Sequence, residues 1–277
     1  GDPAGAGWLG LRVEGNAPTA DNPGGDPADD SGVLRYLRVE AARDPTGANS
    51  VDALRLEGVG SATTVEYVLI SDPDDGVVID GGTVNIAHVV VSAPLDDGVS
   101  WDRGFVGSLD HVYVADAGDH GFLGSNRDGE GDDIAAEPRS NPTLSNVTAN
   151  GAGNNGIRLE YGSLATVVNS VVDGPVTTAL YIEEATAGAS AGLPSFASTL
   201  VYGFTDTAAS IAHEHYDDDA ELATSPFTSG VLVLDPLLDG YLPSPGSPAL
   251  DPAYADTTVS DHLGAFGTDD WALGLWP

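Results

Sequence analysis

Aspartates that recur in short polar turns are the residues of this chain best suited to chemistry. Asp74 and Asp75 stand directly before a glycine, and 22 residues later Asp96 and Asp97 do the same. Stacked carboxylates repel one another, and a hard, oxygen-binding cation such as Ca²⁺ relieves that repulsion. These four aspartates therefore predict a Ca²⁺ site. The alternative is that aspartate suits tight turns and that dissolved salt screens its charge.

A second candidate cation site is the acidic segment 126–133. Its carboxylates are spaced by glycines in the manner of a calcium loop, and they are Asp128, Glu130, Asp132 and Asp133. The segment lacks the full alternation of Asp or Asn and the distal Glu of an EF-hand. A solvated surface loop is therefore the alternative interpretation.

The histidines give weaker signals. His88 and His111 are 23 residues apart, close to the spacing of the aspartate turns, so we expect their rings to stack as a packing ladder and not as a metal pair. His213 and His215 would share one face of a strand, and Asp217 could add a carboxylate, as in some zinc sites. No third ligand to a zinc ion is evident from the sequence.

The acidic turns belong to an internal repeat of about 22 residues. Glycines that end a polar turn and precede a β-rich run recur at Gly76, Gly98, Gly121 and Gly156. The last interval is longer, which indicates an insertion. Each unit carries a second run in which apolar and polar residues alternate, at 64–70, 84–91, 109–114 and 164–172.

This repeat predicts an all-β fold. Short β-branched runs broken by Asp, Asn and Gly are typical of strands and turns. A unit of this length fits one coil of a right-handed parallel β-helix, a single-stranded β-solenoid whose coils stack about 4.8 Å apart. An antiparallel sandwich or jelly roll is the alternative, but it does not require the turn to recur in register. We expect the β-helix over residues 1–210, a loop insertion at about 122–150, and a C-terminal cap over 211–277 packed on the last coils.

The amino-acid composition indicates the environment in which the protein works and excludes some classes of binding partner. The 277 residues carry 43 acidic side chains against nine arginines and no lysine, for a net charge of −34, with 36 glycines and no cysteine. This balance favours an extracellular or cell-surface protein of a halophile, with a secreted protein that binds divalent cations as the alternative. Nucleic acid is an unsuitable partner because a basic footprint is missing. The chain has no apolar run long enough for a transmembrane segment, and without cysteine it forms no disulfide.

Several segments carry a resemblance to a known family. They are Trp8-Leu9-Gly10-Leu11 with 15–18 (GNAP), Asp74-Asp75-Gly76 with 81–85 (GGTVN), and 245–250 (PGSPAL) with 264–267 (GAFG) and Asp269-Asp270-Trp271. Together they resemble bacterial secreted or surface parallel β-helix proteins, many known only as lipoproteins or hypothetical proteins. The resemblance implies the fold and carries over no catalytic residue. In such proteins more β-helix usually precedes the first segment, so we expect an open first coil that favours self-association.

No convincing catalytic constellation is visible in the sequence. Parallel β-helices host polysaccharide lyases and hydrolases, but a lyase needs a cationic or general base, and Arg103 beside Asp102 and Trp101 is the one suggestive arrangement. With so many acids, a carboxylate pair at hydrolase spacing would occur by chance. We therefore expect a non-catalytic structural or adhesive surface protein that assembles into fibres. The alternatives are a carbohydrate-active enzyme, of lyase or hydrolase type, and a glycan-binding module.

Overall fold

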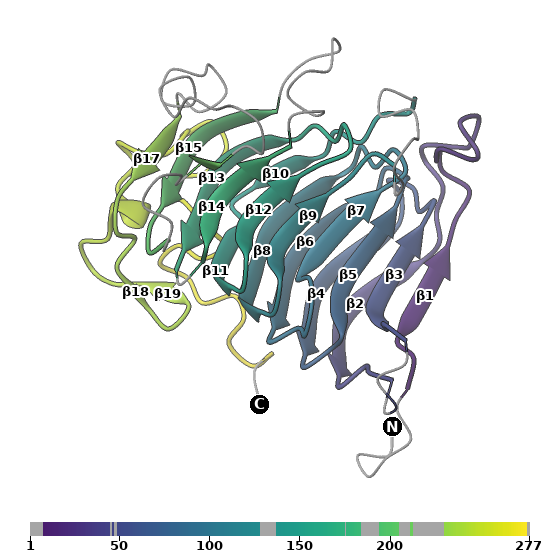
Figure 1. The fold of residues 1–277 in the computed structure, drawn as a ribbon, viewed down its shortest axis with the longest axis horizontal. Helices are drawn as coiled ribbons and strands as arrows, with labels where there is room; N and C mark the ends of the chain where they lie inside the picture. The colour runs from purple at the N-terminus through teal and green to yellow at the C-terminus, as the bar shows by residue number, and fades with distance from the viewer. Residues whose placement is uncertain are drawn as a thin grey trace.

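The computed structural model shows a parallel β-helix built from two long sheets (Figure 1). It describes residues 8–44, 46, 49–127, 137–174, 176–183, 194–204, 211–212 and 230–275. In these residues the one helical element is the short 3-10 helix η2 (Pro248–Leu250). No described helix has the length and apolar character needed to cross a membrane.

The eight-stranded sheet collects one strand from each coil. Its order is β1 (Leu11–Glu14), β3 (Asp52–Glu57), β5 (Asp75–Asp80), β7 (Val99–Asp102), β9 (His120–Gly124), β12 (Asn155–Leu159), β14 (Thr178–Ile182) and β16 (Ile211–Ala212). All neighbouring strands are parallel.

The nine-stranded sheet forms the opposite wall. Its order is β17 (Val231–Val233), β15 (Ser195–Val201), β13 (Thr166–Asp173), β10 (Thr143–Ser145), β8 (Ser108–Ala117), β6 (Asn85–Ser92), β4 (Thr64–Ser71) and β2 (Val33–Glu40), while β11 (Thr148–Ala152) pairs with β13 and β8. Its pairs are also parallel. Since β9 ends at Gly124 and β10 begins at Thr143, the extra residues of the predicted insertion lie between these two strands.

The repeated glycines stand where the two walls approach each other. A Cβ on Gly98 would overlap a methyl group of Val114, and one on Gly76 would lie 2.6 Å from a methyl group of Val91. The residues that follow the glycines pair in register, with Val77 opposite Val99. The spacing between these glycines therefore equals the length of one coil in residues, as the sequence predicted.

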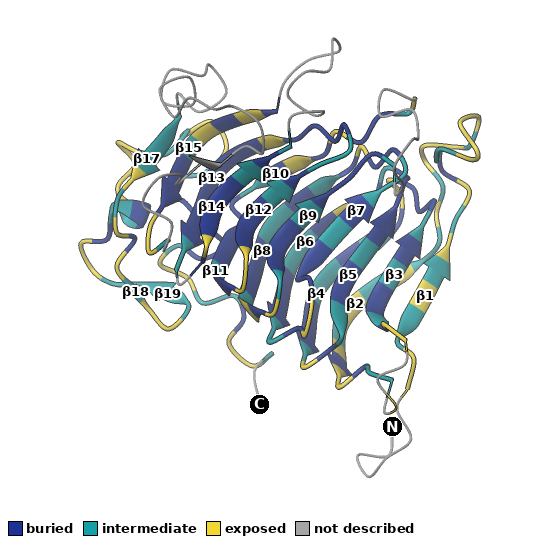
Figure 2. Cartoon of the chain, in the orientation of Figure 1, coloured by how far each residue is buried: buried dark blue, intermediate teal, exposed yellow. Residues whose placement is uncertain are grey.

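The core runs along the axis between the sheets (Figure 2). Large apolar side chains from successive coils stack in register, for example Val77, Val99 and Phe122 in the eight-stranded sheet, all at most 1% exposed. β-branched side chains suit such stacking because they lose little rotamer freedom in a strand.

Six strands of the nine-stranded sheet (β2, β4, β6, β8, β13 and β15), and the junction between β10 and β11, carry a residue with positive φ near the middle of the wall. These residues occupy matching positions on successive coils, with φ between 48° and 55°: Tyr36, Tyr67, His88, His111, Asn146, Asn169 and Ser198. We call them the left-handed column. Its rings stack at centroid distances of 5.2, 4.7 and 5.1 Å from Tyr36 through to His111. The predicted stacking of His88 on His111 is confirmed.

The C-terminal tail, residues 237–275, contains the hairpin of β18 (Leu238–Asp239) and β19 (Leu242–Pro243) and lies against the nine-stranded sheet. Phe266 packs with Leu69, Val90 and Tyr113, side chains from β4, β6 and β8. Farther along the sheet, the tail is tied down by the left-handed column, where the Asn146 amide donates to Ser260 Oγ at 2.8 Å. The predicted division into a helix and a cap at residue 210 stays a prediction, because most of 205–229 lies outside the described residues.

Candidate functional site

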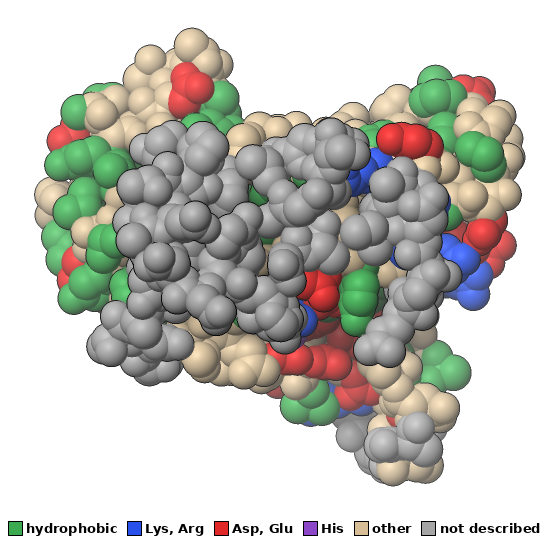
Figure 3. Space-filling model, turned by 45° about the horizontal axis from the view of Figure 1, so that its top comes forward, with side chains coloured by type: hydrophobic (Ala, Val, Ile, Leu, Met, Phe, Trp, Pro, Cys, Tyr) green, Lys and Arg blue, Asp and Glu red, His purple; other side chains and the backbone are tan. Residues whose placement is uncertain are grey.

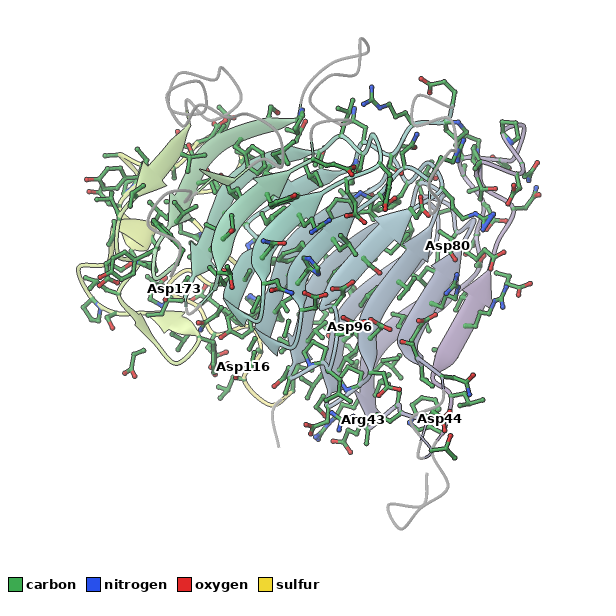
Figure 4. All side chains as sticks on the ribbon, in the orientation of Figure 1. Arg43, Asp44, Asp80, Asp96, Asp116 and Asp173 are labelled. Atoms are coloured by element: carbon green, nitrogen blue, oxygen red, sulfur yellow. The ribbon has the colours of Figure 1, made fainter. Side chains whose placement is uncertain are left out.

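The acidic turns stack at the start of the strands of the eight-stranded sheet. Backbone hydrogen bonds join them coil to coil, from Asp96 N to Asp74 O and from Asp119 N to Asp96 O, each at 3.0 Å. We call the stacked pairs 74–75, 96–97, 119–120 and 154–155 the turn ladder. Asp96 marks it in Figure 4, on the outside of the eight-stranded sheet. The register therefore converts a sequence repeat into a line of neighbouring carboxylates.

A carboxylate–imidazole group lies in the middle of the turn ladder. His120 Nδ1 is 2.9 Å from Asp97 Oδ1 and 3.3 Å from Asp119 Oδ1. Asp97 also accepts the His120 backbone N–H at 3.1 Å, and Asn154 donates its amide to Asp119. Asp97 and His120 are only 8% and 7% exposed. These contacts fix the imidazole with Nδ1 toward both carboxylates.

Asp75 lies one coil before this group. Its carboxylate accepts the hydroxyl of Ser50 and the backbone N–H of Asp97, the latter at 3.3 Å. Burial raises the pKa of Asp75 to about 6, and the nearby charges of Asp96 and Asp97 act in the same direction. Asp75 is therefore a carboxyl group that holds its proton into mildly acidic solution, next to a carboxylate–imidazole pair.

The opposite ends of the same strands have a different electrostatic character. There Arg55 pairs with Asp80 at the end of β5, and Arg103 pairs with Asp21, whereas the second partner of Arg55, Asp52, is the first residue of β3 and lies in register with Asp75. Figure 3 likewise shows the visible arginine side chains next to acidic ones. No ion pair in the described part of the chain joins an arginine to Asp74, Asp75, Asp96, Asp97 or Asp119. The turn ladder thus carries negative charge that no described arginine compensates.

The geometry allows two kinds of chemistry at the turn ladder. Asp97, Asp119 and His120 each offer one ligand atom within 4.8 Å of the others, so this group could hold a cation. Alternatively, a protonated Asp75 beside the Asp97–His120 pair provides an acid and a base on adjacent coils.

A comparison with family models matches residues 6–229 to the pectate-lyase-like β-helix domain. The chain belongs to this family of pectate-lyase-like β-helix domains. The match and the observed sheets confirm the predicted parallel β-helix and the coarse resemblance to β-helix proteins. Neither the curated proteins nor the solved structures contain a match to the chain.

The pectate-lyase-like domain brings together only part of the predicted Ca²⁺ site. Asp74, Asp75, Asp96 and Asp97 lie in adjacent turns of the ladder, but only Asp97 belongs to the group with converging ligand atoms. The other predicted ligands, Asp128, Glu130, Asp132 and Asp133, lie outside the described residues, as do His213, His215 and Asp217. Calcium binding stays a prediction.

Other candidate residues of the pectate-lyase-like domain lie in structural positions. Trp101 is 1% exposed and donates its indole N–H to Ser163 Oγ at 3.0 Å, so it belongs to the core. Arg103, next to it in the suggestive arrangement, pairs with Asp21.

Sequence reasoning missed the role of His120. The signal was available, because Asp119-His120 precedes Gly121 as Asp96-Asp97 precedes Gly98. The residue directly before the glycine is aspartate in two successive turns and histidine in the third. Such a change of residue type at a repeated position marks a candidate site.

Proposed function

We propose that this domain is an extracellular, salt-adapted, carbohydrate-active protein that hydrolyses glycosidic bonds at the turn ladder. The observation that carries the proposal is Asp75, a carboxyl group with its pKa raised to about 6 by burial, one coil from the Asp97–His120 pair. Membership of the pectate-lyase-like family supports a carbohydrate role, although a fold alone does not specify an activity.

In the proposed reaction Asp75 acts as the general acid, and the group around His120 acts as the general base. Asp75 gives its proton to the glycosidic oxygen as the bond from that oxygen to the anomeric carbon breaks. Water adds to the anomeric carbon, and its proton passes to the group formed by Asp97, Asp119 and His120. Hydrolysis is favoured over a lyase reaction because lysine is absent and no described arginine pairs with the turn ladder from Asp74 to Asp119.

The test is release of reducing ends from a panel of neutral and acidic polysaccharides in molar NaCl. Asp75→Asn should lower the rate at least about 100-fold, since general acid catalysis contributes on this scale. Asp256→Asn is the control, because this partly exposed aspartate lies in the tail, away from the ladder. Full activity in Asp75→Asn, or no cleavage of any polysaccharide, would overturn the proposal.

The structural or adhesive role predicted from sequence is the second candidate. One observation favours it: β2 is an edge strand of its sheet, and Val33 and Tyr36 on it are 69% and 70% exposed. Exposed edge strands pair readily with other chains. Sedimentation in molar NaCl tests this, and a monomer at every protein concentration would exclude fibre formation.

A further inference from the structure

Three histidines meet where the C-terminal tail, yellow in Figure 1, lies on the nine-stranded sheet. His88 and His111 stack in the left-handed column at a centroid distance of 5.1 Å, and His262 of the tail lies 5.6 Å from His111. Trp271, also from the tail, meets the His88 ring at 5.0 Å with an interplanar angle of 84°. The charge on these imidazoles therefore acts directly on the contact between the tail and the sheet.

His88 differs from the other two histidines because no carboxylate is paired with it. Nδ1 of His111 is 3.0 Å from Asp110 Oδ2, and Nδ1 of His262 is 3.2 Å from Asp261 Oδ1. In the described part of the chain His88 forms no ion pair, and its Nδ1 is buried without a hydrogen-bond partner. His88 is thus the histidine of this group on which an added proton would lack a paired carboxylate.

The carboxylates that act on His88 from the neighbouring strands already have other partners. On β4, Glu66 pairs with Arg35. On β8, Asp110 pairs with His111. Neither carboxylate can form an ion pair with His88 without weakening the pair that it has.

Within the described residues, the tail brings no carboxylate into an ion pair with His88 either. Asp270 accepts the Tyr241 hydroxyl at 2.7 Å, and Asp261 lies beside the histidine of the tail. On the other side of His88, the ring of Tyr67 stacks at a centroid distance of 4.7 Å. His88 is therefore enclosed by rings, and each of these carboxylates is held by another group.

These surroundings favour the neutral imidazole as long as the tail is docked. Burial and then the charge of His111 lower the pKa of His88 from its usual 6.5, although Asp110 and Glu66 act in the opposite direction. Once the tail leaves, the ring is exposed to water and binds a proton more tightly. Release of the tail thus takes up a proton. The docked state is fully stable above about pH 6.5 and loses stability as the pH falls below this value.

We propose that His88 is a pH sensor that releases the C-terminal tail from the nine-stranded sheet in mildly acidic solution. Protonation places a positive charge in contact with the His111 ring and with Trp271, without an ion-pair partner. Departure of the tail admits water to the imidazolium and removes this cost. The tail is therefore a strap that is closed at neutral pH and opens in acid.

Release of the tail uncovers an apolar strip on the nine-stranded sheet. Leu69, Val90 and Tyr113 are at most 3% exposed while the tail is docked, and they form one cluster with Phe266 of the tail. They come from β4, β6 and β8, so the strip runs along the axis over three coils. The sensor thus couples acidity to the exposure of a surface that is closed at neutral pH.

The experiment is hydrogen exchange of the whole chain in 1 M NaCl at pH 5, 6, 7 and 8, with rates corrected for the intrinsic effect of pH. The reporters are the N–H groups of Gly264 and Ala265, which donate to Asn169 O and Thr148 Oγ1 across the contact between tail and sheet. Uptake of one proton raises the release constant up to about tenfold for each pH unit below 6.5, so opening should increase at least about tenfold between pH 8 and pH 5. The N–H groups of β6 and β8 should stay protected throughout.

Two variants remove the sensor and keep the column. His88→Tyr preserves a stacked ring, because Tyr67 holds the same position one coil earlier with φ of 54° against 55°. It should reduce the change in opening between pH 8 and pH 5 to less than about twofold. His88→Asn serves if the phenol disturbs Trp271, since Asn146 occupies the column at a φ of 52°. It should loosen the tail at every pH and likewise remove the pH dependence.

His111→Tyr is the matched control, because it removes a titrating ring from the same column and leaves His88 in place. Burial is the larger effect on His88, so this variant should keep a rise of at least about fivefold. A tenfold rise that persists in the His88 variants, or its loss in His111→Tyr, would overturn the proposal. Equal protection of the reporters at pH 5 and pH 8 in the native chain, or strands that lose protection in step with the tail, would overturn it as well.

Discussion

Replacing Asp75 by asparagine should stabilise the protein at pH 8 and leave its stability unchanged at pH 4. Burial raises the pKa of Asp75 from 3.8 to about 6 in the folded chain. A raised acid pKa means that the folded state holds the proton more tightly, so the associated stability is fully present below pH 3.8 and is lost as pH rises through 6. At pH 8 the folded protein therefore carries the cost of an ionised, partly buried carboxylate.

The magnitude follows from the size of the shift. A change of about two pKa units corresponds to about 3 kcal/mol, which is an upper bound for the gain. Asparagine keeps the shape of the side chain, and its Oδ1 can still accept the Asp97 N–H while its Nδ2 donates to the Ser50 hydroxyl. For a chain of this size each kcal/mol moves the melting temperature by about 2–4 °C, so a rise of up to about 6–12 °C is expected.

The assay is thermal unfolding by circular dichroism in molar NaCl, with the variant and the native chain compared at pH 4, 6 and 8. Taking the difference between the two chains cancels the titration of the other acids. Asp44→Asn is the control of opposite sign, because its hydrogen bonds with Thr46 and Asn49 lower the pKa of Asp44 to about 2. Equal gains for Asp75→Asn at pH 4 and pH 8, or a loss at pH 8, would refute the reasoning.

Three further predictions concern the turns and the tail. Gly98→Ala should lower the free energy of unfolding by about 1–3 kcal/mol in urea denaturation, because its Cβ would overlap Val114; an unchanged midpoint would contradict the close approach of the walls. Asn169→Ala should cost about 1–3 kcal/mol and expose the tail to limited proteolysis, because Asn169 bonds both the N–H and the carbonyl oxygen of Asp256; resistance equal to the native chain would argue against this anchor. Millimolar Ca²⁺ at constant ionic strength should raise the melting temperature and chelator should reverse it, and no change would leave the turns as screened surface charge.

The fold could be predicted because each coil repeats a steric requirement. Only glycine fits where Gly76 and Gly98 meet the opposite wall, so the spacing of glycines reports the length of a coil. The left-handed column could not be predicted in the same way. Asparagine tolerates positive φ, but Tyr36 and Tyr67 give no local sign of it, and their conformation follows from stacking in register.

The candidate site was only partly predictable, for a related reason. The sequence indicates Asp97 because an aspartate stands at the same place in the preceding turn, whereas His120 interrupts the pattern and belongs to the site through contact. No local pattern of residue types reports such a contact.

The turn ladder also has the properties of a linear polyelectrolyte. Five carboxylates, from Asp74, Asp75, Asp96, Asp97 and Asp119, stand on three successive coils. At about 4.8 Å per coil this is about one charge for every 3 Å of axis, about half the charge density of duplex DNA with its 1.7 Å per charge. A line of charge this dense condenses counterions, which stay near it without fixed ligands. The free energy of folding should then vary with the logarithm of salt concentration and depend on the valence of the cation more than on its coordination chemistry. The raised pKa values of Asp75 and Asp96 fit this view, since neighbouring carboxylates contribute to both and a proton can serve as the counterion.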